Sequence, residues 1–424
     1  MSAADRRLRI LVVGVDFGWG SAGKLSSILS ALRAGTPAEI TGIGTRLGRP
    51  VFGEGLLNSW EECDVGDPAD IRRVVRAVRP DVALVVLDPH AATALEAAGC
   101  PVVYVDSLPF LWTSHDPVPF DVSVYCAQRT LPLPGPAAQV MASVANLRWV
   151  EPIVGRAVGR EHVGADARRG HALINVGGLH SPFSGPGDSS YLDLVLSAAL
   201  TALASSGITD VVITGNVDAA ALSLPEGLPR PVVGPQPHHR FLTLLESAEV
   251  VLTSPGLTTI LELAAMGRTA ALLPPQNLSQ VLNAELVAAR CDPSFVVGWP
   301  QWMLARDTVA RWHARGEDHA VERIQSRITG VARSPVDRAR AGRAITDGLR
   351  KALSASAAPG RSFSALTPKA TGPTRWPRRS SDSPAGARSR RPPEPAHLNG
   401  LPEPACLNGP SEPARPNGPS GRPT

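Results

Sequence analysis

The sequence is poor in aromatic residues, which make up 4% of its 424 residues, whereas hydrophobic residues of all kinds make up 43%. A core of ordinary size must therefore be built from valine, leucine, alanine and isoleucine, the composition typical of buried parallel sheets. The chain is also too long for one ordinary domain, and its length favours two or three.

Cysteine is scarce as well, and its pattern excludes two common uses. The five cysteines are scattered, with no Cys-x-x-Cys pair and no Cys/His group at metal-ligand spacing. Their odd number argues against a disulfide framework, so we expect buried thiols in a reducing cytoplasm. The apolar run before Asp16 is too short for a signal peptide, and no later run approaches a membrane span. The expected location is the cytoplasm, with at most peripheral contact with a membrane.

Lysine occurs only three times, and positive charge gathers at the C-terminal end. From Ala355 onward there are ten basic residues and four acidic ones, a net charge of +6. Since the whole chain has a formal charge of +4, the part before Ala355 carries −2. A nearly neutral body disfavours a nucleic-acid partner, although the sequence pI is about 9.0.

The N-terminal part alternates strands with helices. An apolar, β-branched run at residues 8–15 predicts a buried strand, and a glycine-rich loop and a helix over 22–34 follow it. Strands that alternate with helices of crossover length indicate a parallel sheet with both faces covered. We predict a Rossmann-like domain over residues 1–150. Its further expected elements are strands at 38–43, 81–87 and 101–105 and helices at 70–78 and 91–98.

A second α/β unit of similar size is predicted over residues 151–354. An apolar strand at 172–176 restarts the alternation, and the amphipathic segment 302–353 is expected to supply closing helices. The expected fold class is α/β, with two Rossmann-like domains facing a cleft. The other expected elements are strands at 210–214, 249–253 and 269–273 and helices at 191–205, 241–248, 258–266 and 280–290.

Residues 355–424 form a tail rich in Pro, Ser, Gly and Arg. Three copies of an eight-residue unit recur in it: PEPAHLNG from Pro393, PEPACLNG from Pro402 and SEPARPNG from Ser411. Such a segment cannot bury enough apolar surface to offset the entropy lost on ordering, so we predict disorder.

The loop after the first strand, GWGSAGK at residues 18–24, matches two phosphate-binding patterns imperfectly. As a dinucleotide fingerprint it begins too late after the strand, and no acidic residue ends the second strand. As a P-loop it lacks the hydroxyl that should follow the lysine and hold Mg²⁺, because Leu25 stands there. A glycine-rich turn that lets a substrate approach helix amides is a third interpretation, and a plain tight turn is a fourth.

The most specific motif is TSPGLTTILELAAMGRTAALLPPQNLSQVLNA, residues 253–284. It predicts a strand, a helix entered at Gly256, a glycine stop, a second strand and an amide-containing loop before another helix. A glycine at a helix entrance permits close approach of a diphosphate, whose charge the helix dipole favours. Glu262 is the one acid on an otherwise apolar helix and could accept both hydroxyls of a ribose. The alternative is an exposed polar position on an amphipathic helix.

This motif resembles the donor-binding region of GT-B glycosyltransferases, notably bacterial N-acetylglucosaminyltransferases of peptidoglycan synthesis and UDP-glycosyltransferases. The shared pattern is a glycine-rich turn, the helical ELAAxG from Glu262, and a loop with Gln and Asn before Asn283-Ala284. The resemblance implies transfer from a UDP-sugar without cofactor or metal, with residues 1–150 binding the acceptor. The implied donor-binding residues are Gly177, Gly178, His180, Gly256, Leu257, Thr258, Glu262, Asn277 and Gln280.

Three short segments, at residues 16–24, 104–112 and 177–182, are similar to cytosylglucuronate synthases. Those enzymes of nucleoside-antibiotic pathways join cytosine to glucuronic acid from UDP-glucuronate. The similarity therefore implies glucuronyl transfer to a nucleobase, and a relative with another acceptor is the alternative.

Inverting attack by an acceptor requires a general base across the cleft. Asp16, at the end of the first strand, is the candidate, although it could instead cap a turn or helix. Lys24 opens a helix, where a cation is unfavourable, which suggests an anionic ligand such as a sugar carboxylate. Gly20, Asp106 and Trp112 are the other candidates for the acceptor or sugar-carboxylate site, with loop packing as the alternative role of Asp106 and Trp112.

Three other functions stay open at this point. A P-loop phosphotransferase would turn over ATP with Mg²⁺ at the loop over residues 18–24. A nucleotide-sugar epimerase on the same fold would need paired acid and base groups, which are not evident near His180. A non-catalytic relative would bind a partner enzyme instead. The expected partners are a UDP-sugar and a small-molecule acceptor, with no nucleic acid; the sequence does not predict an oligomeric state.

Overall fold

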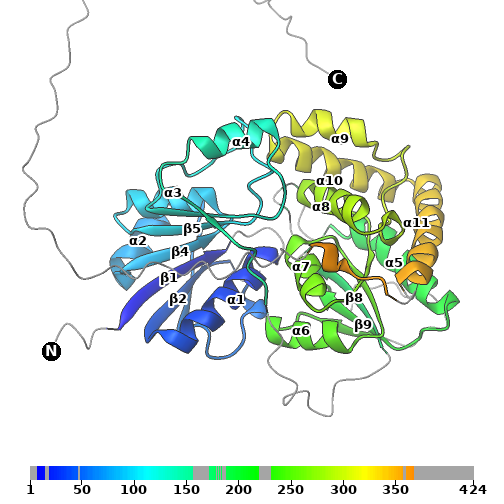
Figure 1. Cartoon of the computed structure of the whole chain (residues 1–424), viewed down its shortest axis with the longest axis horizontal. Coiled ribbons are helices and arrows are strands. Elements are labelled where there is room, and N and C mark those ends of the chain that lie inside the picture. Colours follow the sequence, from blue (N-terminus) through cyan, green and yellow to red (C-terminus); the bar gives the residue numbers. More distant parts are fainter. Residues whose placement is uncertain are drawn as a thin grey trace, which may run out of the picture. The chain divides into compact units, whose positions relative to one another are not determined.

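The computed structural model in Figure 1 describes residues 7–14, 19–45, 48–155, 171–177, 179, 181, 183, 188–218, 231–356 and 360–366. Residues Met1–Thr371 belong to one compact unit. The repeats predicted to be disordered, and the rest of the chain from residue 367, lie outside the described residues.

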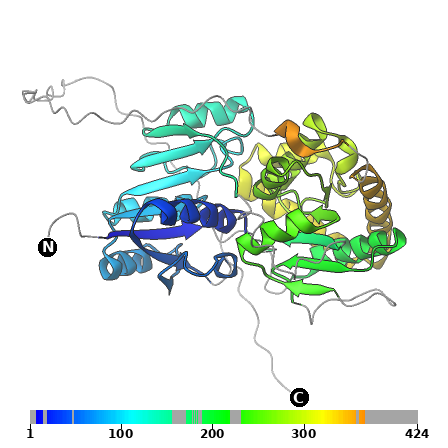
Figure 2. The ribbon, with the colours of Figure 1, turned by 60° about the horizontal axis from the view of Figure 1, so that its bottom comes forward.

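A seven-stranded parallel sheet forms in the N-terminal part, with the order β3-β2-β1-β4-β5-β6-β7. Figure 2 shows its strands side by side in blue to cyan. β2 and β3 lie on one side of β1, and β4 to β7 follow on its other side. The strand order therefore reverses between β1 and β4. The strands are β1 (Leu8–Gly14), β2 (Ala38–Gly44), β3 (Ser59–Glu62), β4 (Val82–Val86), β5 (Val102–Asp106), β6 (Val124–Gln128) and β7 (Leu147–Val150). The helices are α1 (Gly20–Gly35), α2 (Pro68–Val78), α3 (Pro89–Ala97) and α4 (Gly135–Ala142).

A five-stranded parallel sheet follows, with the order β10-β9-β8-β11-β12, which reverses between β8 and β11. Its strands are β8 (Ala172–Gly177), β9 (Val211–Gly215), β10 (Val232–Gly234), β11 (Val250–Thr253) and β12 (Ala271–Leu272). The helices of this part are α5 (Ser190–Ser205), α6 (His238–Ser247), α7 (Leu257–Ala265), α8 (Leu278–Arg290), α9 (Arg306–His313), α10 (Glu317–Arg333) and α11 (Pro335–Ser356).

Both faces of the first sheet are covered by hydrophobic packing, as its apolar strands require. Ile10 and Val12 of β1 belong to one buried cluster, and Leu11 and Val13 belong to another. Successive side chains of a strand point to opposite faces, so a continuous apolar run needs helices on both sides. The predicted α/β class with two Rossmann-like parallel sheets is confirmed. The division at residue 150 stays a prediction.

Four strands and one helix, α4, lie outside the segments predicted from the sequence. Three of the strands, β3, β7 and β10, form sheet edges, and their residues are exposed or half-buried. The central strands are predicted from continuous apolar runs. An edge strand needs no such run, because solvent reaches it on one side. β6 lies within residues 107–135, a proline-rich segment for which no strand was predicted.

The ordered body also extends past residue 354. α11 continues to Ser356, and α10 and α11 pack on α5. Phe363 is fully buried against Phe295, with ring centroids 5.6 Å apart. Phe363 thus anchors residues 360–366, which composition alone had assigned to the tail.

Candidate functional site

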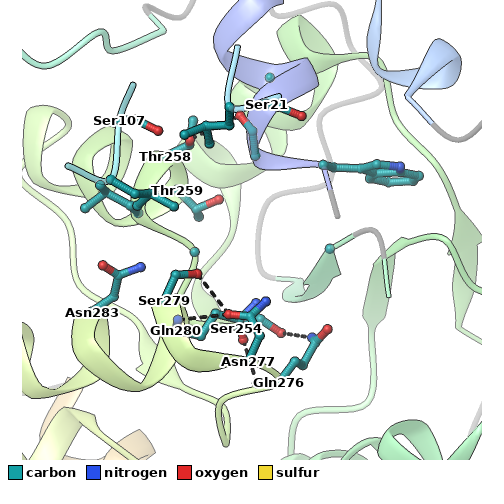
Figure 3. Close-up of a pocket in the computed structure, with 18 of the residues that line it drawn as sticks. Ser21, Ser107, Ser254, Thr258, Thr259, Gln276, Asn277, Ser279, Gln280 and Asn283 are labelled. Carbon is teal, nitrogen blue, oxygen red and sulfur yellow. Dashed lines mark hydrogen bonds between the residues drawn. The ribbon is translucent and has the colours of Figure 1, made fainter. Parts of the chain in front are cut away.

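A cavity of about 500 Å³ is lined by residues from the carboxyl ends of strands in both sheets (Figure 3). Leu87 and Asp88 follow β4, Ser107 follows β5, Gly177 ends β8 and Ser254 follows β11. In open parallel sheets, ligands bind outside the carboxyl ends where the strand order reverses. The cavity therefore lies where the topology of each sheet predicts a ligand.

The N-terminus of α7 points into this cavity. Gly256 and the first helical residues, Leu257 and Thr258, line it. The N-cap residue is Gly256, which has no side chain to accept from the first amides of the helix. These amides and the positive end of the helix dipole therefore suit an anion. Thr258 Oγ1 donates to the carbonyl of Gly20 at 3.4 Å, which links α7 to α1 at the cavity wall.

Glu262 lies farther along α7, lines the cavity and is 1% exposed. Its Oε1 accepts a hydrogen bond from His238 Nε2 at 2.7 Å. Its Oε2 is buried and has no hydrogen-bond partner among the described residues. The alternative that Glu262 occupies an exposed helix position is wrong. An unpaired buried carboxylate oxygen is costly, so this atom is suited to accept a hydrogen bond from a ligand.

Asn283 supplies a second unpaired acceptor. It is 1% exposed and lines the cavity. Its Nδ2 donates to the Pro255 carbonyl at 3.0 Å, and its Oδ1 has no partner in the part of the chain that the structure describes. Two buried acceptor atoms in one cavity match a ligand that brings hydroxyl or amide donors.

Two of the predicted donor-binding residues, Asn277 and Gln280, belong to a hydrogen-bonded loop at the start of α8. Asn277 Oδ1 caps α8 by accepting from the backbone N–H of Gln280 at 3.0 Å. Gln280 Oε1 accepts from the backbone N–H of Gln276 at 2.9 Å. Gln276 Nε2 donates to Ser254 Oγ at 2.7 Å and to the Val176 carbonyl at 2.8 Å. These bonds engage the side-chain oxygens of Asn277 and Gln280, so each can offer its amide nitrogen to a ligand.

Several other predicted residues also line the cavity. Gly177 does so with φ of 69°, a left-handed conformation that favours glycine. Gly20 and Trp112 line it from the side of the first sheet. The structure thus gathers Gly20, Trp112, Gly177, Gly256, Leu257, Thr258, Glu262, Asn277 and Gln280 around one cavity. Asp16, Gly178 and His180 lie outside the described residues.

Lys24 is not among the described residues that line the cavity. It is 1% exposed, and its Nζ donates to Gln128 Oε1 at 3.1 Å and to the Ile153 carbonyl at 3.4 Å. Burial lowers the pKa of Lys24 to about 8, and the negative charge of Glu262 opposes this shift. These protein contacts account for the unusual lysine without a sugar carboxylate.

Asp106 also lies behind the cavity wall, where it is fully buried. Its Oδ2 accepts from Trp112 Nε1 at 2.6 Å and from the Tyr125 hydroxyl at 2.7 Å. Its Oδ1 accepts from the amide of Leu108 at 2.8 Å. Asp106 therefore fixes Trp112, which does line the cavity. The geometry fits the packing alternative that the sequence left open.

Four carboxylates that were not singled out as site residues line the cavity: Asp88, Asp116, Glu317 and Asp318. Asp116 Oδ1 accepts from the amide of Glu317 at 2.7 Å, so the loop after β5 contacts the start of α10. Asp88 follows a predicted strand, a signal that could have identified it. The pairing of Asp116 with Glu317 spans 201 residues and left no local pattern.

The partly buried Glu317 should make stability depend on pH. Burial, and then the nearby Asp116, Asp318 and Asp106, raise the pKa of Glu317 to about 8 from 4.5. Because the folded pKa is raised, the stabilisation is fully present below pH 4.5 and is lost as the pH rises toward 8. Each pKa unit corresponds to about 1.4 kcal/mol. Glu317→Gln should therefore gain melting temperature relative to the wild type between pH 5 and pH 9, measured by thermal unfolding. A difference that does not vary with pH would contradict the shift.

No protein-family model matches the chain, and no curated protein matches it by sequence. Solved structures with a similar arrangement include a protein described as a UDP-N-acetylglucosamine 2-epimerase from Listeria monocytogenes. It is 12% identical, with a TM-score of 0.47, over 76% of this chain and 91% of that one.

Two glycosyltransferases are also similar. Phytolacca americana UGT2, solved with UDP-2-fluoro-glucose and pterostilbene, is 13% identical with a TM-score of 0.43, over 84% of this chain and 98% of that one. The glycosyltransferase SnogD from Streptomyces nogalater is 16% identical with a TM-score of 0.41, over 81% and 100%. Identities and TM-scores this low do not transfer an activity to this chain.

Among the described residues, no helix is long and apolar enough to cross a membrane. No three or more His, Cys, Asp and Glu side chains in this part of the chain form a group that could hold a metal ion.

Proposed function

We propose that the chain is a glycosyltransferase that moves a sugar from a UDP-sugar to a small-molecule acceptor. One observation carries the proposal. The uncapped entrance of α7 and the unpaired Oε2 of Glu262 line the same cavity. The first suits a diphosphate, and the second suits the hydroxyls of the attached ribose.

The donor is expected to lie along the second sheet. Its diphosphate would meet the amides at Gly256, Leu257 and Thr258 beside the turn at Gly177, and its sugar would meet the amide nitrogens of Asn277 and Gln280. Gly178 and His180, outside the described residues, are proposed to complete the phosphate site. The acceptor would enter from the side of Gly20 and Trp112.

The proposed reaction is an inverting displacement that uses no metal and no cofactor. An N–H or O–H group of the acceptor attacks the anomeric carbon, and the new bond forms as the bond to the diphosphate oxygen breaks. The diphosphate leaves with that electron pair, and the α7 dipole and amides stabilise its charge. The acceptor's proton passes to a general base, for which Asp16 stays our proposal.

Glucuronyl transfer to a nucleobase, as in cytosylglucuronate synthases, is the finer form of the proposal. A glucuronate carboxylate needs a cationic or hydrogen-bonding partner. None of the described lining residues is Lys or Arg, and Lys24 is bonded to Gln128 and Ile153. The carboxylate would therefore depend on amides or on residues outside the described part of the chain. A neutral hexose fits the described lining better.

Calorimetry with UDP and incubation with UDP-sugars test the proposal. We expect UDP to bind with or without EDTA, and an acceptor-dependent release of UDP from one of UDP-glucose, UDP-N-acetylglucosamine or UDP-glucuronate. Nucleobases and nucleosides, cytosine among them, should be screened as acceptors. A new sugar epimer formed from the donor alone, followed by NMR, would instead establish an epimerase. Absence of UDP binding would refute the proposal.

A further inference from the structure

The hydrogen bond between His238 and Glu262 joins two buried side chains from consecutive helices. Their side chains are 8% and 1% exposed, and the Nε2–Oε1 distance is 2.7 Å. His238 begins α6 directly after Pro237. Leu242 of α6 and Ile260 of α7 share a hydrophobic cluster, so the packing of the two helices fixes the distance between the pair.

The pair is closely covered on a second side. A methyl group added at Gly155 would lie 2.6 Å from Cε1 of His238 and 3.0 Å from Oε1 of Glu262. One added at Gly23, in α1, would lie 3.8 Å from Nε2 of His238. The imidazole therefore has little room to move.

This arrangement divides the two oxygens of Glu262 between the protein and the cavity. Because the carboxylate only accepts, Nε2 of His238 must donate to Oε1. Oε2 has no partner among the described residues. Without the imidazole both oxygens would be unpaired in a buried site, and the carboxylate could rotate away from the cavity.

We propose that His238 is a positioning residue for nucleotide recognition, holding Glu262 so that Oε2 faces the ribose hydroxyls of the donor. The inference rests on the proposed function, because it requires a nucleoside diphosphate in this cavity. His238 also lines the cavity, but its Nε2 is engaged by Glu262, and its proposed role is to act through that carboxylate. Its effect should therefore appear only in the part of the affinity that the ribose hydroxyls contribute.

The test compares the affinities of UDP and 2′,3′-dideoxy-UDP by calorimetry in the full-length protein. A hydrogen bond to a charged group contributes about 1.5–3 kcal/mol, so the wild type should prefer UDP by about tenfold or more. In His238→Ala this preference should fall to about twofold or less. His238→Gln, whose amide can donate to Oε1, should recover most of it. Gly155→Ala should lose the preference as well, by displacing the ring, and it serves if His238→Ala fails to fold.

His239→Ala is the matched control. His239 is the next residue of α6, but it is exposed and lies outside the described cavity lining. This variant should keep the wild-type preference. If His238→Ala weakens both ligands equally, the residue is merely structural and the inference is wrong, while the proposed function stands. If the wild type binds UDP but does not distinguish the two ligands, the ribose role of Glu262 and this inference are both overturned. If the wild type does not bind UDP, the proposed function falls too.

Discussion

Glu262→Ala is expected to raise the dissociation constant of UDP by about 10- to 150-fold, the equivalent of one hydrogen bond between a hydroxyl and a charged group. The reason is the unpaired Oε2, which is buried in the cavity wall and can accept from the ribose. Glu262→Gln retains one side-chain oxygen and should lose less. Calorimetry gives the affinity, and initial rates should show a matching rise in the donor KM.

Glu285→Ala is the matched control for this prediction. Glu285 is also a helical glutamate, but it lies in α8, pairs with Arg306 at 2.8 Å and is absent from the described cavity lining. Its removal should leave UDP affinity unchanged. Because Glu262→Ala also leaves His238 without a partner, thermal unfolding must show that the variant is folded. A folded Glu262→Ala protein with wild-type affinity would remove the main support for the proposed donor site.

Asp106→Ala is expected to destabilise the fold by about 3 kcal/mol or more, because each buried donor left unpaired costs about 1–3 kcal/mol. Three donors would lose their acceptor: Trp112 Nε1, the Tyr125 hydroxyl and the amide of Leu108. Urea unfolding measures the loss. Since Trp112 lines the cavity, acceptor binding should weaken as well.

The loss of stability caused by Asp106→Ala should depend on pH. Burial raises the pKa of Asp106 to about 6 from 3.8, although its three hydrogen bonds oppose the shift. The stabilisation that follows is therefore present at low pH and lost as the pH rises through 6. The difference between the wild type and Asp106→Ala should be larger at pH 5 than at pH 8. Asp121→Asn, which changes an exposed carboxylate, should shift stability by less than about 0.5 kcal/mol. A similar effect of both variants would contradict the role of the buried network.

The central elements of both sheets could be predicted because their signals are local. β1, β4 and β11 are apolar runs, which only a strand covered on both faces explains. The edge strands β3 and β7 could not be found in this way, since solvent on one side removes the need for apolar residues. Helix starts were misplaced where a polar residue opens the helix, as His238 does in α6.

The residues of the candidate site could likewise be predicted only where their signal is local. Gly256 and Glu262 could be identified because a glycine at a helix entrance and a lone acid on an apolar helix are visible within ten residues. Lys24 was as conspicuous, but its partners Gln128 and Ile153 lie more than 100 residues away, and only folding shows that they occupy it.

Local patterns in the sequence are enough to specify two parallel α/β units and a helix whose N-terminal end could receive a diphosphate. These properties follow from periodicity, glycine placement and the dipole of a single helix. Which charged groups pair within the protein and which face the cavity depends on how distant segments pack together. In the folded protein Lys24 donates to Gln128, Asp106 accepts from Trp112, and one oxygen of Glu262 accepts from His238. These hydrogen bonds join segments far apart in the chain. A buried polar atom needs a hydrogen-bond partner, which is either another part of the protein or a ligand.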